Sequence, residues 1–354
     1  MSGKTGLPIH LSKTSSPAPK PPAESLSFGK YFTDHMFKAT YSGGAWKNFE
    51  ITARGPLSID PGACVLHYGQ ALFEGMKAFR QQDGRCVLFR PDYNWARMKS
   101  GAERLCMVAP PQNVFVEGIR ELVRVDQEWI PHQPGCSLYI RPTLIGTEAF
   151  LGVRPAQEYL FFVILSPVGA YYSSGTDPIK IWVEEEYLRA APGGLGETKA
   201  AANYAGSLKA ALVAREKGYS QVLWLDVDKK NVEEVGTMNV FFVFDDEIVT
   251  PQLSGTILAG GVRDAILTLL KTMHKKVSQK KLSLQEIREA SSSGRLKEAF
   301  GTGTAAVVTP IGELAAKNWH IKMNSGPLAS ELSKTLTEIQ TGIRPDPYGW
   351  ISPL

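Results

Sequence analysis

A lysine among small residues is the first candidate for chemistry in this sequence. Lys199 lies in the run Gly193–Gly206 (GGLGETKAAANYAG), with no other lysine or arginine between Arg189 and Lys209. Small apolar neighbours are expected to desolvate the amine partly, which disfavours its charged form and lowers its pKa. A neutral amine can attack a carbonyl group and form a Schiff base. The run alone is also compatible with a lysine that ends a glycine-rich loop and points into water.

A carboxylate about three dozen residues later is the second candidate. Glu234 lies in the run EEVGTMN between two stretches that predict buried strands, Gln221–Asp226 and Val240–Phe244. A buried carboxylate needs a partner. The protonated ring nitrogen of pyridoxal phosphate (PLP) would be one, because an acid there keeps the ring able to accept electrons. The alternative is a carboxylate that caps a turn at the end of a hairpin.

The motifs around these two residues resemble the fold-type IV PLP-dependent aminotransferases, and most of all the branched-chain amino acid aminotransferase family. The resemblance runs from about Phe28 to the C-terminus. It is carried by GETKAAANY, EVGTMN and GTGT, and by FGKYFTDHM, YGQALFEGMKAFR, FRPDYNWARM and LYIRPTLIGTE. With these motifs present in the order of the family, the catalytic interpretation of Lys199 is favoured over the structural one.

The resemblance implies an α/β (α+β) fold of two domains, with the cofactor at their interface. A small N-terminal α/β domain would cover residues 28–167, and a larger pseudo-barrel domain that binds the cofactor would cover residues 179–354. Residues 168–178 would link the two, within a stretch rich in Pro, Gly, Ser and Asp. Residues 1–27 are rich in Ser, Pro and Lys and are expected to be disordered.

The resemblance also implies a set of PLP-binding residues. Lys199 would bind PLP and move the proton of the substrate, Glu234 would hold the ring nitrogen, and Tyr204 would hydrogen-bond the ring oxygen. The others would bind the phosphate or lie beside it or the ring: Arg97, Arg189, Thr237, Gly261, Val262 and Thr304. The residues themselves support part of this, since the glycine-rich stretch before a helix at Arg263 leaves backbone N–H groups at a positive helix end. Without the resemblance, Arg97 would be taken for an ion pair on a helix surface.

A substrate pocket follows from the same resemblance. Its walls would be formed by Phe32, Tyr68, Phe73, Tyr139, Val153 and Tyr171. Arg141 would bind the distal carboxylate of glutamate or 2-oxoglutarate, and Thr237 and Ala305 would lie near the α-carboxylate. The implied activity is a ping-pong transfer of the amino group between Leu, Ile or Val and 2-oxoglutarate. The composition alone would place these aromatic residues in a core.

Three alternatives remain open. D-Amino acid aminotransferase and aminodeoxychorismate lyase share the fold, the lysine and the glutamate, although the long N-terminal domain with FTDHM and LFEGMKAF favours the branched-chain enzyme. The third is a protein that kept the fold as a cofactor-free binding module. The complete set of Lys199, Tyr204 and Glu234 argues against it.

The composition excludes several other classes. A hydrophobic content of 43% and a charged content of 21% are those of an ordinary globular protein, and a net charge of +4 is too weak to indicate a nucleic-acid partner. No stretch is long enough to span a membrane, and residues 1–27 have neither a secretory apolar core nor the arginines of a transit peptide. Four scattered cysteines indicate neither a zinc site nor a disulfide framework. We therefore expect a cytoplasmic enzyme without a metal; the resemblance adds a homodimer.

Local patterns predict some elements directly. Apolar spacing predicts helices over Pro91–Leu105 and Val114–Trp129, and a third helix over Tyr204–Lys217 that ends at Gly218. Asp83–Gly84 predicts a hairpin turn. Ser283 and Glu286 form a capping-box pattern at the start of a further helix.

Overall fold

The computed structural model describes residues 6–169, 177–324 and 326–354. Its contacts divide the chain into two compact units. The first unit comprises Met1–Tyr171, Thr198–Ala201 and Thr337–Leu354, and the second comprises Tyr172–Glu197 and Ala202–Leu336. The four residues around Lys199 thus belong to the first unit, although the chain on both sides of them belongs to the second.

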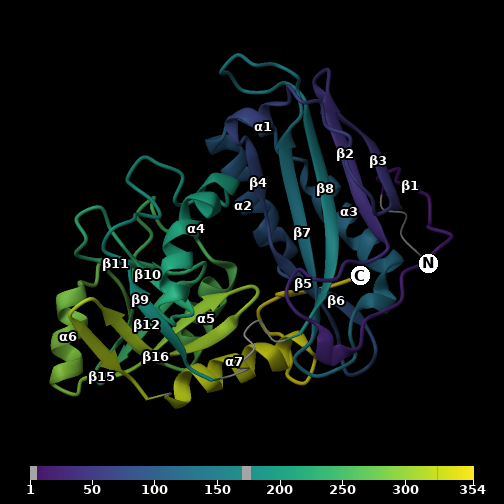
Figure 1. Ribbon diagram of the computed structural model, residues 1–354. Helices are drawn as coiled ribbons and strands as arrows, with labels where there is room; N and C mark the ends of the chain where they lie inside the picture. Colours follow the sequence, from purple (N-terminus) through teal and green to yellow (C-terminus); the bar gives the residue numbers. More distant parts are fainter. Residues whose placement is uncertain (1–5, 170–176, 325) are drawn as a thin grey trace. The chain divides into compact units, whose positions relative to one another are not determined.

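A nine-stranded sheet forms the first unit, with the strand order β1-β3-β2-β8-β7-β5-β6-β18 and β4 paired to β7 (Figure 1). All its pairs are antiparallel except β1 with β3. The strands are β1 (His10–Leu11), β2 (His35–Ser42), β3 (Ala45–Ala53), β4 (Ala71–Phe73), β5 (Met76–Arg80), β6 (Cys86–Phe89), β7 (Ser137–Gly146), β8 (Tyr159–Val168) and β18 (Ile351–Pro353). The predicted hairpin turn is confirmed, because Arg80 pairs with Cys86 across Gly84, which has a φ of 84°.

Helices pack against one face of this sheet. The helices of this unit are α1 (Cys64–Tyr68), α2 (Pro91–Arg104) and α3 (Gln112–Val125), with short 3-10 helices η1 (Ala23–Ser25) and η2 (Gln127–Trp129). Apolar side chains at helical spacing on α3, such as Phe115 and Ile119, join Phe37 and Phe161 of the sheet in one buried core. Gly118 permits this packing, since an added Cβ would lie 2.7 Å from the Phe37 ring. The predicted helices over 91–105 and 114–129 are confirmed, except that the second ends at Val125.

The N-terminal arm differs from the disorder that its composition predicts. From residue 6 onward it has defined contacts: β1 pairs with β3, and the backbone N–H of Thr14 donates to Nε2 of His35 (2.9 Å). The N–H of Ala18 donates to Oδ1 of Asp34 (2.7 Å). Both acceptors lie at the start of β2 or just before it, so the order of the arm depends on residues far from it in the chain.

A second nine-stranded sheet forms the second unit, in the order β11-β10-β9-β16-β15-β12-β13-β14 with β17 paired to β16. It mixes parallel and antiparallel pairs, and an isolated bridge joins Val235 of β11 to Met238 before β12. The strands are β9 (Ile179–Val183), β10 (Gln221–Leu225), β11 (Val232–Val235), β12 (Asn239–Phe244), β13 (Ile248–Thr250), β14 (Val277–Gln279), β15 (Leu296–Gly303), β16 (Val307–Ala316) and β17 (Trp319–Lys322).

The helices that belong to this part of the chain are α4 (Ala201–Glu216), α5 (Gly261–Thr272), α6 (Leu284–Ser292) and α7 (Pro327–Gln340). The predicted third helix corresponds to α4, and Gly218 follows it with a φ of 83°. The capping box is confirmed. The Ser283 hydroxyl accepts a hydrogen bond from the backbone N–H of Glu286, and the Glu286 carboxylate accepts one from the backbone N–H of Ser283. These local features arise from residues within one turn of each other.

Within the described ranges, no helix combines the length and apolar character needed to cross a membrane. No group of His, Cys, Asp and Glu in the same ranges could hold a metal ion. All four cysteines are free; Cys64 is buried and Cys106 is exposed.

Candidate functional site

Lys199 lies beside an aromatic ring of the first unit. Its Nζ is 4.8 Å from the centre of the Phe73 ring, and its carbonyl oxygen accepts a hydrogen bond from the Phe73 N–H (3.2 Å). The bridge between Leu72 and Ala200 fixes this segment along β4. The side chain is half-buried. The sequence predicted small neighbours for the amine; the tertiary structure adds an aromatic face.

The same ring also contacts a guanidinium group. The Cζ of Arg141 lies 4.5 Å from the centre of the Phe73 ring, and Nη2 of Arg141 donates to the hydroxyl of Tyr139 (2.9 Å). The Phe28 ring meets the Tyr139 ring edge-on at 4.8 Å. Four residues predicted for one site, Lys199, Phe73, Tyr139 and Arg141, are thus brought together. Phe28 was missed, although it begins the motif FGKYFTDHM.

Strand register explains why these side chains share a face. Tyr139 and Arg141 lie two residues apart on β7, and Phe73 pairs with Thr143, two residues further on. Alternate residues of a strand point to the same side of the sheet. The intervening Leu138 and Ile140 belong to the core on the opposite side. One side of the sheet therefore carries the chemistry and the other the packing.

Arg97 is held by a carboxylate that the sequence did not single out. Nε and Nη2 of Arg97 donate to Oε1 and Oε2 of Glu74 at 2.7 and 2.6 Å. Glu74 is fully buried, and its Oε2 also accepts from Nδ2 of Asn94 (2.7 Å) and from the N–H of Gly75 (3.2 Å). The carboxylate and amide fix one edge of the guanidinium group.

Glu234 forms the centre of a second cluster, in the second unit. It lies within β11 opposite Trp224 and is buried. Its Oε2 is 3.2 Å from Nε of Arg189, and its Oε1 accepts from the N–H of Leu258 (2.9 Å) and from Nδ2 of Asn239 (3.3 Å). Arg189, predicted near the phosphate or the ring, therefore pairs with Glu234.

The cluster continues into the loop that starts α5. Nδ2 of Asn239 also donates to the carbonyl of Leu258 (2.9 Å), and Gly260 is the N-cap of α5. A Cβ on Gly260 would lie 2.0 Å from Oδ1 of Asn239, so only glycine fits there. Gly261 and Val262 form the first turn of α5, where backbone N–H groups and the helix dipole favour an anion.

A second buried carboxylate lies next to Glu234. The Oε1 of Glu233 accepts from the hydroxyl of Thr256, and Nη2 of Arg189 donates to the carbonyl of Thr256 and to that of Gly196 (3.0 Å). Burial raises the pKa of Glu233, while the Thr256 hydrogen bond and Arg189 lower it in part. Arg189 therefore contacts two loops, at Gly196 and Thr256, and also Glu234 on β11, the strand that carries both glutamates.

The remaining cofactor-site candidates are spread over the second unit. Thr237 is exposed in the turn after β11, Tyr204 is half-buried on α4, and Thr304 and Ala305 are half-buried in the turn between β15 and β16. Their predicted roles remain predictions.

Three further residues predicted for the pocket walls are described by other contacts or by their exposure. The Phe32 ring packs against Arg54, with Cζ at 5.1 Å. Val153 is 87% exposed, and Tyr68 is also exposed, with its hydroxyl donating to the carbonyl of Leu151. Tyr171 lies outside the described residues.

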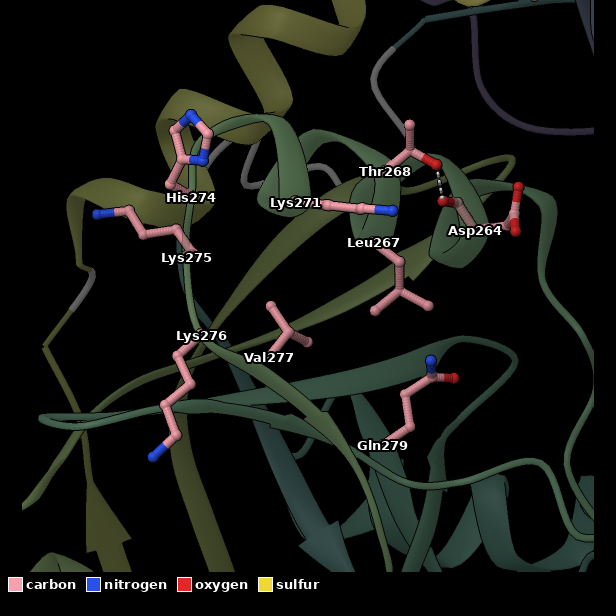
Figure 2. A pocket seen from close by; sticks show the side chains of 9 residues that line it. All are labelled: Asp264, Leu267, Thr268, Lys271, His274, Lys275, Lys276, Val277 and Gln279. Atoms are coloured by element: carbon pink, nitrogen blue, oxygen red, sulfur yellow. Dashed lines mark hydrogen bonds between the residues drawn. The ribbon is translucent and has the colours of Figure 1, made fainter.

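A cavity of about 610 Å³ in the second unit is lined by none of the predicted site residues. Figure 2 shows the lysines around it, Lys271, Lys275 and Lys276, with their amines pointing in different directions. A preorganised anion site needs convergent donors, so we do not assign a site here. The lysines at the end of α5 are better explained by the negative helix end.

The donor sets present match the parts of PLP. A half-buried amine suits its aldehyde, the first turn of α5 with its constrained glycine suits a phosphate, and the buried Glu234 carboxylate suits a protonated ring nitrogen. The residues fit the group on chemical grounds.

Comparison with known proteins agrees with this match. The sequence pattern of the family described as "Amino-transferase class IV" matches residues 71–314. "Branched-chain-amino-acid aminotransferase 2" of Bacillus subtilis is 48% identical over 97% of this chain and 96% of its own length. The "Branched-chain-amino-acid aminotransferase" of Mycolicibacterium smegmatis is 42% identical over 98% of both chains.

A solved structure shows the same fold. The branched-chain amino acid aminotransferase from Escherichia coli superimposes with a TM-score of 0.72 at 26% identity, over 90% of this chain and 98% of that one. The predicted α/β fold of type IV is confirmed, and the chain belongs to the class IV aminotransferase family.

Proposed function

We propose that this protein is a PLP-dependent branched-chain amino acid aminotransferase. It would exchange the amino group between Leu, Ile or Val and 2-oxoglutarate in a ping-pong reaction. The observation that carries the proposal is the Phe73 ring, which contacts both the amine of Lys199 and the guanidinium group of Arg141. An apolar surface beside a nucleophilic amine suits a branched side chain, and the guanidinium group suits a dicarboxylate.

Two clusters would hold the cofactor. PLP supplies an aldehyde and a ring that accepts electrons from the α-carbon of the substrate. We propose that Lys199 binds the aldehyde and Tyr204 the ring oxygen, and that Glu234, kept in place by Arg189, accepts the hydrogen bond of the ring nitrogen. Arg97, Thr304 and the first turn of α5 would bind the phosphate.

The amine of Lys199 would also move the proton. We propose that its Nζ takes the proton from the α-carbon of the amino acid and later returns a proton as a general acid. The Phe73 ring lies 4.8 Å from the amine and limits the access of water to it on one side. Thr237 and Ala305 would orient the α-carboxylate.

An exposed apolar surface supports a homodimer. Tyr68, Phe150, Leu151 and Val153 are all exposed in the first unit, together with Leu66 on α1. Clusters of exposed apolar side chains of this kind usually mark an interface. We propose that a second copy covers them, and that the enzyme is cytoplasmic and binds small molecules rather than nucleic acid. Light scattering of the Leu151→Glu variant tests the dimer: it should be monomeric where the parent is dimeric.

The visible absorption spectrum of the purified protein tests the function. With PLP bound, we expect a band at about 410–430 nm that collapses when L-leucine is added and returns with 2-oxoglutarate. A band that ignores L-leucine and responds to a D-amino acid would transfer the proposal to the D-amino acid aminotransferase alternative. A protein that takes up no PLP would overturn the enzyme interpretation in favour of a binding module.

A further inference from the structure

Lys77 lies on the face of the sheet that carries Phe73, Tyr139 and Arg141. It is on β5, where it pairs directly with Tyr139 of β7. Its neighbours Met76 and Ala78 belong to the apolar core on the other side of the sheet. Lys77 therefore projects toward the side where Arg141 donates to the Tyr139 hydroxyl.

This face carries two cationic side chains, that of Lys77, which is buried, and that of Arg141, which is half-buried. Lys77 is 7% exposed, and the Nε of Arg141 is buried without a hydrogen-bond partner among the described residues. A buried donor without a partner is destabilising unless a ligand provides one. An anionic ligand group on this face would meet that need.

The dicarboxylate and the branched-chain substrate differ in the group that this face would have to bind. The distal group of glutamate or 2-oxoglutarate is a carboxylate, whereas that of leucine is an isobutyl group. Burying an apolar group against a fixed charge is unfavourable, because the charge loses its solvation. Arg141 cannot lose its proton, but a lysine can.

We propose that Lys77 determines specificity by changing its charge with the substrate. Protonated, it helps Arg141 hold the distal carboxylate of the dicarboxylate substrate; neutral, it accepts the branched apolar side chain. The assignment rests on the proposed function.

The surroundings of Lys77 suit this role. Burial lowers its pKa to about 8, so about nine in ten molecules carry the charge at pH 7 and about one in ten at pH 9. The neighbouring elements contribute Tyr139 and Arg141 on β7. Glu74, three residues before Lys77, pairs with Arg97, and the Phe73 ring contacts both Arg141 and Lys199. The strand on the other side, β6, runs CVLF and contributes no charged side chain. A bound carboxylate would raise the pKa of Lys77, and an apolar group would lower it further.

Two unreactive acids can distinguish the protonated from the neutral form of Lys77 by their binding. Glutaric acid ends in a carboxylate and 4-methylvaleric acid in an isobutyl group. Their dissociation constants for the holoenzyme are measured by calorimetry from pH 7 to 9, and the ratio of the two cancels effects common to both. In the parent, we expect the preference for glutarate over 4-methylvalerate to fall up to about a hundredfold over this range, because the protonated fraction of Lys77 falls about tenfold and its neutral fraction rises about tenfold.

Variants assign the effect to Lys77. Lys77→Met should weaken glutarate binding about ten- to a hundredfold, tighten 4-methylvalerate binding at pH 7 up to about tenfold because no proton has to be lost, and give a flat pH profile. Lys77→Arg should retain the binding of glutarate at pH 9 and weaken the binding of 4-methylvalerate. The control is Lys99→Met, which removes an exposed lysine of α2 and should change neither acid.

Equal weakening of both acids in Lys77→Met, or a parent preference that does not change from pH 7 to 9, would overturn the inference. If Lys77→Met does not fold, the pH dependence of the binding preference in the parent and the binding of both acids to Lys77→Arg still test the inference. Failure of the proposed function is distinguishable: the parent spectrum would then not respond to L-leucine at all.

Discussion

The carboxylate of Glu74 accepts two hydrogen bonds from one edge of the Arg97 guanidinium group, at 2.7 and 2.6 Å. Glu74 itself is fully buried. Arg97 itself is only 10% exposed in its side chain. A fork-to-fork pair of this kind fixes direction as well as charge. The guanidinium group of Arg97 is therefore held in a defined orientation.

Removing this carboxylate should destabilise the protein and weaken its cofactor binding. We expect Glu74→Ala to lower the free energy of unfolding by about 3–5 kcal/mol, because a buried arginine loses the carboxylate that balances its charge. Urea denaturation measures this, and fluorescence titration should show a higher dissociation constant for PLP. Glu103→Ala is the control, since it breaks only an exposed pair with Lys99; equal effects of the two variants would contradict the assignment.

Lys199→Ala should abolish the reaction without affecting the fold. The amine is half-buried and has no role in either core, so the urea midpoint should change little. Turnover of leucine should fall by at least about 10²–10⁴, the usual contribution of one acid–base group, and the leucine-sensitive band should be absent. Lys209→Ala, on the exposed side of α4, is the matched control. Turnover near the parental rate in Lys199→Ala would rule out the catalytic role.

Arg189 and Glu234 should be energetically coupled. They are 45 residues apart in the chain, their side chains are only 9% and 5% exposed, and Nε of Arg189 lies 3.2 Å from Oε2 of Glu234. A double-mutant cycle with Arg189→Met and Glu234→Gln, measured by urea denaturation of the cofactor-free protein, should give a coupling energy of about 0.5–3 kcal/mol. Additive effects would show that the pair does not hold Glu234 in place.

Glu298 should make stability depend on pH. It lies buried on β15 and accepts from the N–H groups of Leu328 and Ala329 at the start of α7, both at 3.2 Å. Burial raises the pKa of this carboxyl above its ordinary value of 4.5, although the two hydrogen bonds oppose the shift. The folded state then binds the proton more tightly than the unfolded state, so the unfolding free energy falls as pH rises from about 4.5 through the raised pKa.

The measurement is a comparison of the parent with Glu298→Gln, which stays neutral at every pH. The stability advantage of the parent should shrink as pH rises from about 4.5 to 7.5. Glu331→Gln, an exposed position on α7, should show a constant difference from the parent. An advantage of the parent that grows with pH would mean that the backbone hydrogen bonds outweigh burial.

Short-range patterns in the sequence were enough to predict the local elements and the kinds of chemistry available. The capping box at Ser283 and Glu286, the hairpin turn at Gly84 and the end of α4 before Gly218 each depend on residues within a few positions. The small neighbours of Lys199 and the glycines before α5 were visible for the same reason. The family motifs were sufficient to predict the fold.

The contacts between residues far apart in the chain could not be predicted in this way. Glu74 is 23 residues from Arg97, and Arg189 is 45 from Glu234; such pairs depend on strand register and loop paths, which no local pattern specifies. The order of the N-terminal arm likewise depends on His35 and Asp34, and its own composition predicted disorder. Lys77 looks like any lysine of an alternating strand. Its burial, which lowers its pKa, is a property of the folded protein that the sequence around it does not reveal.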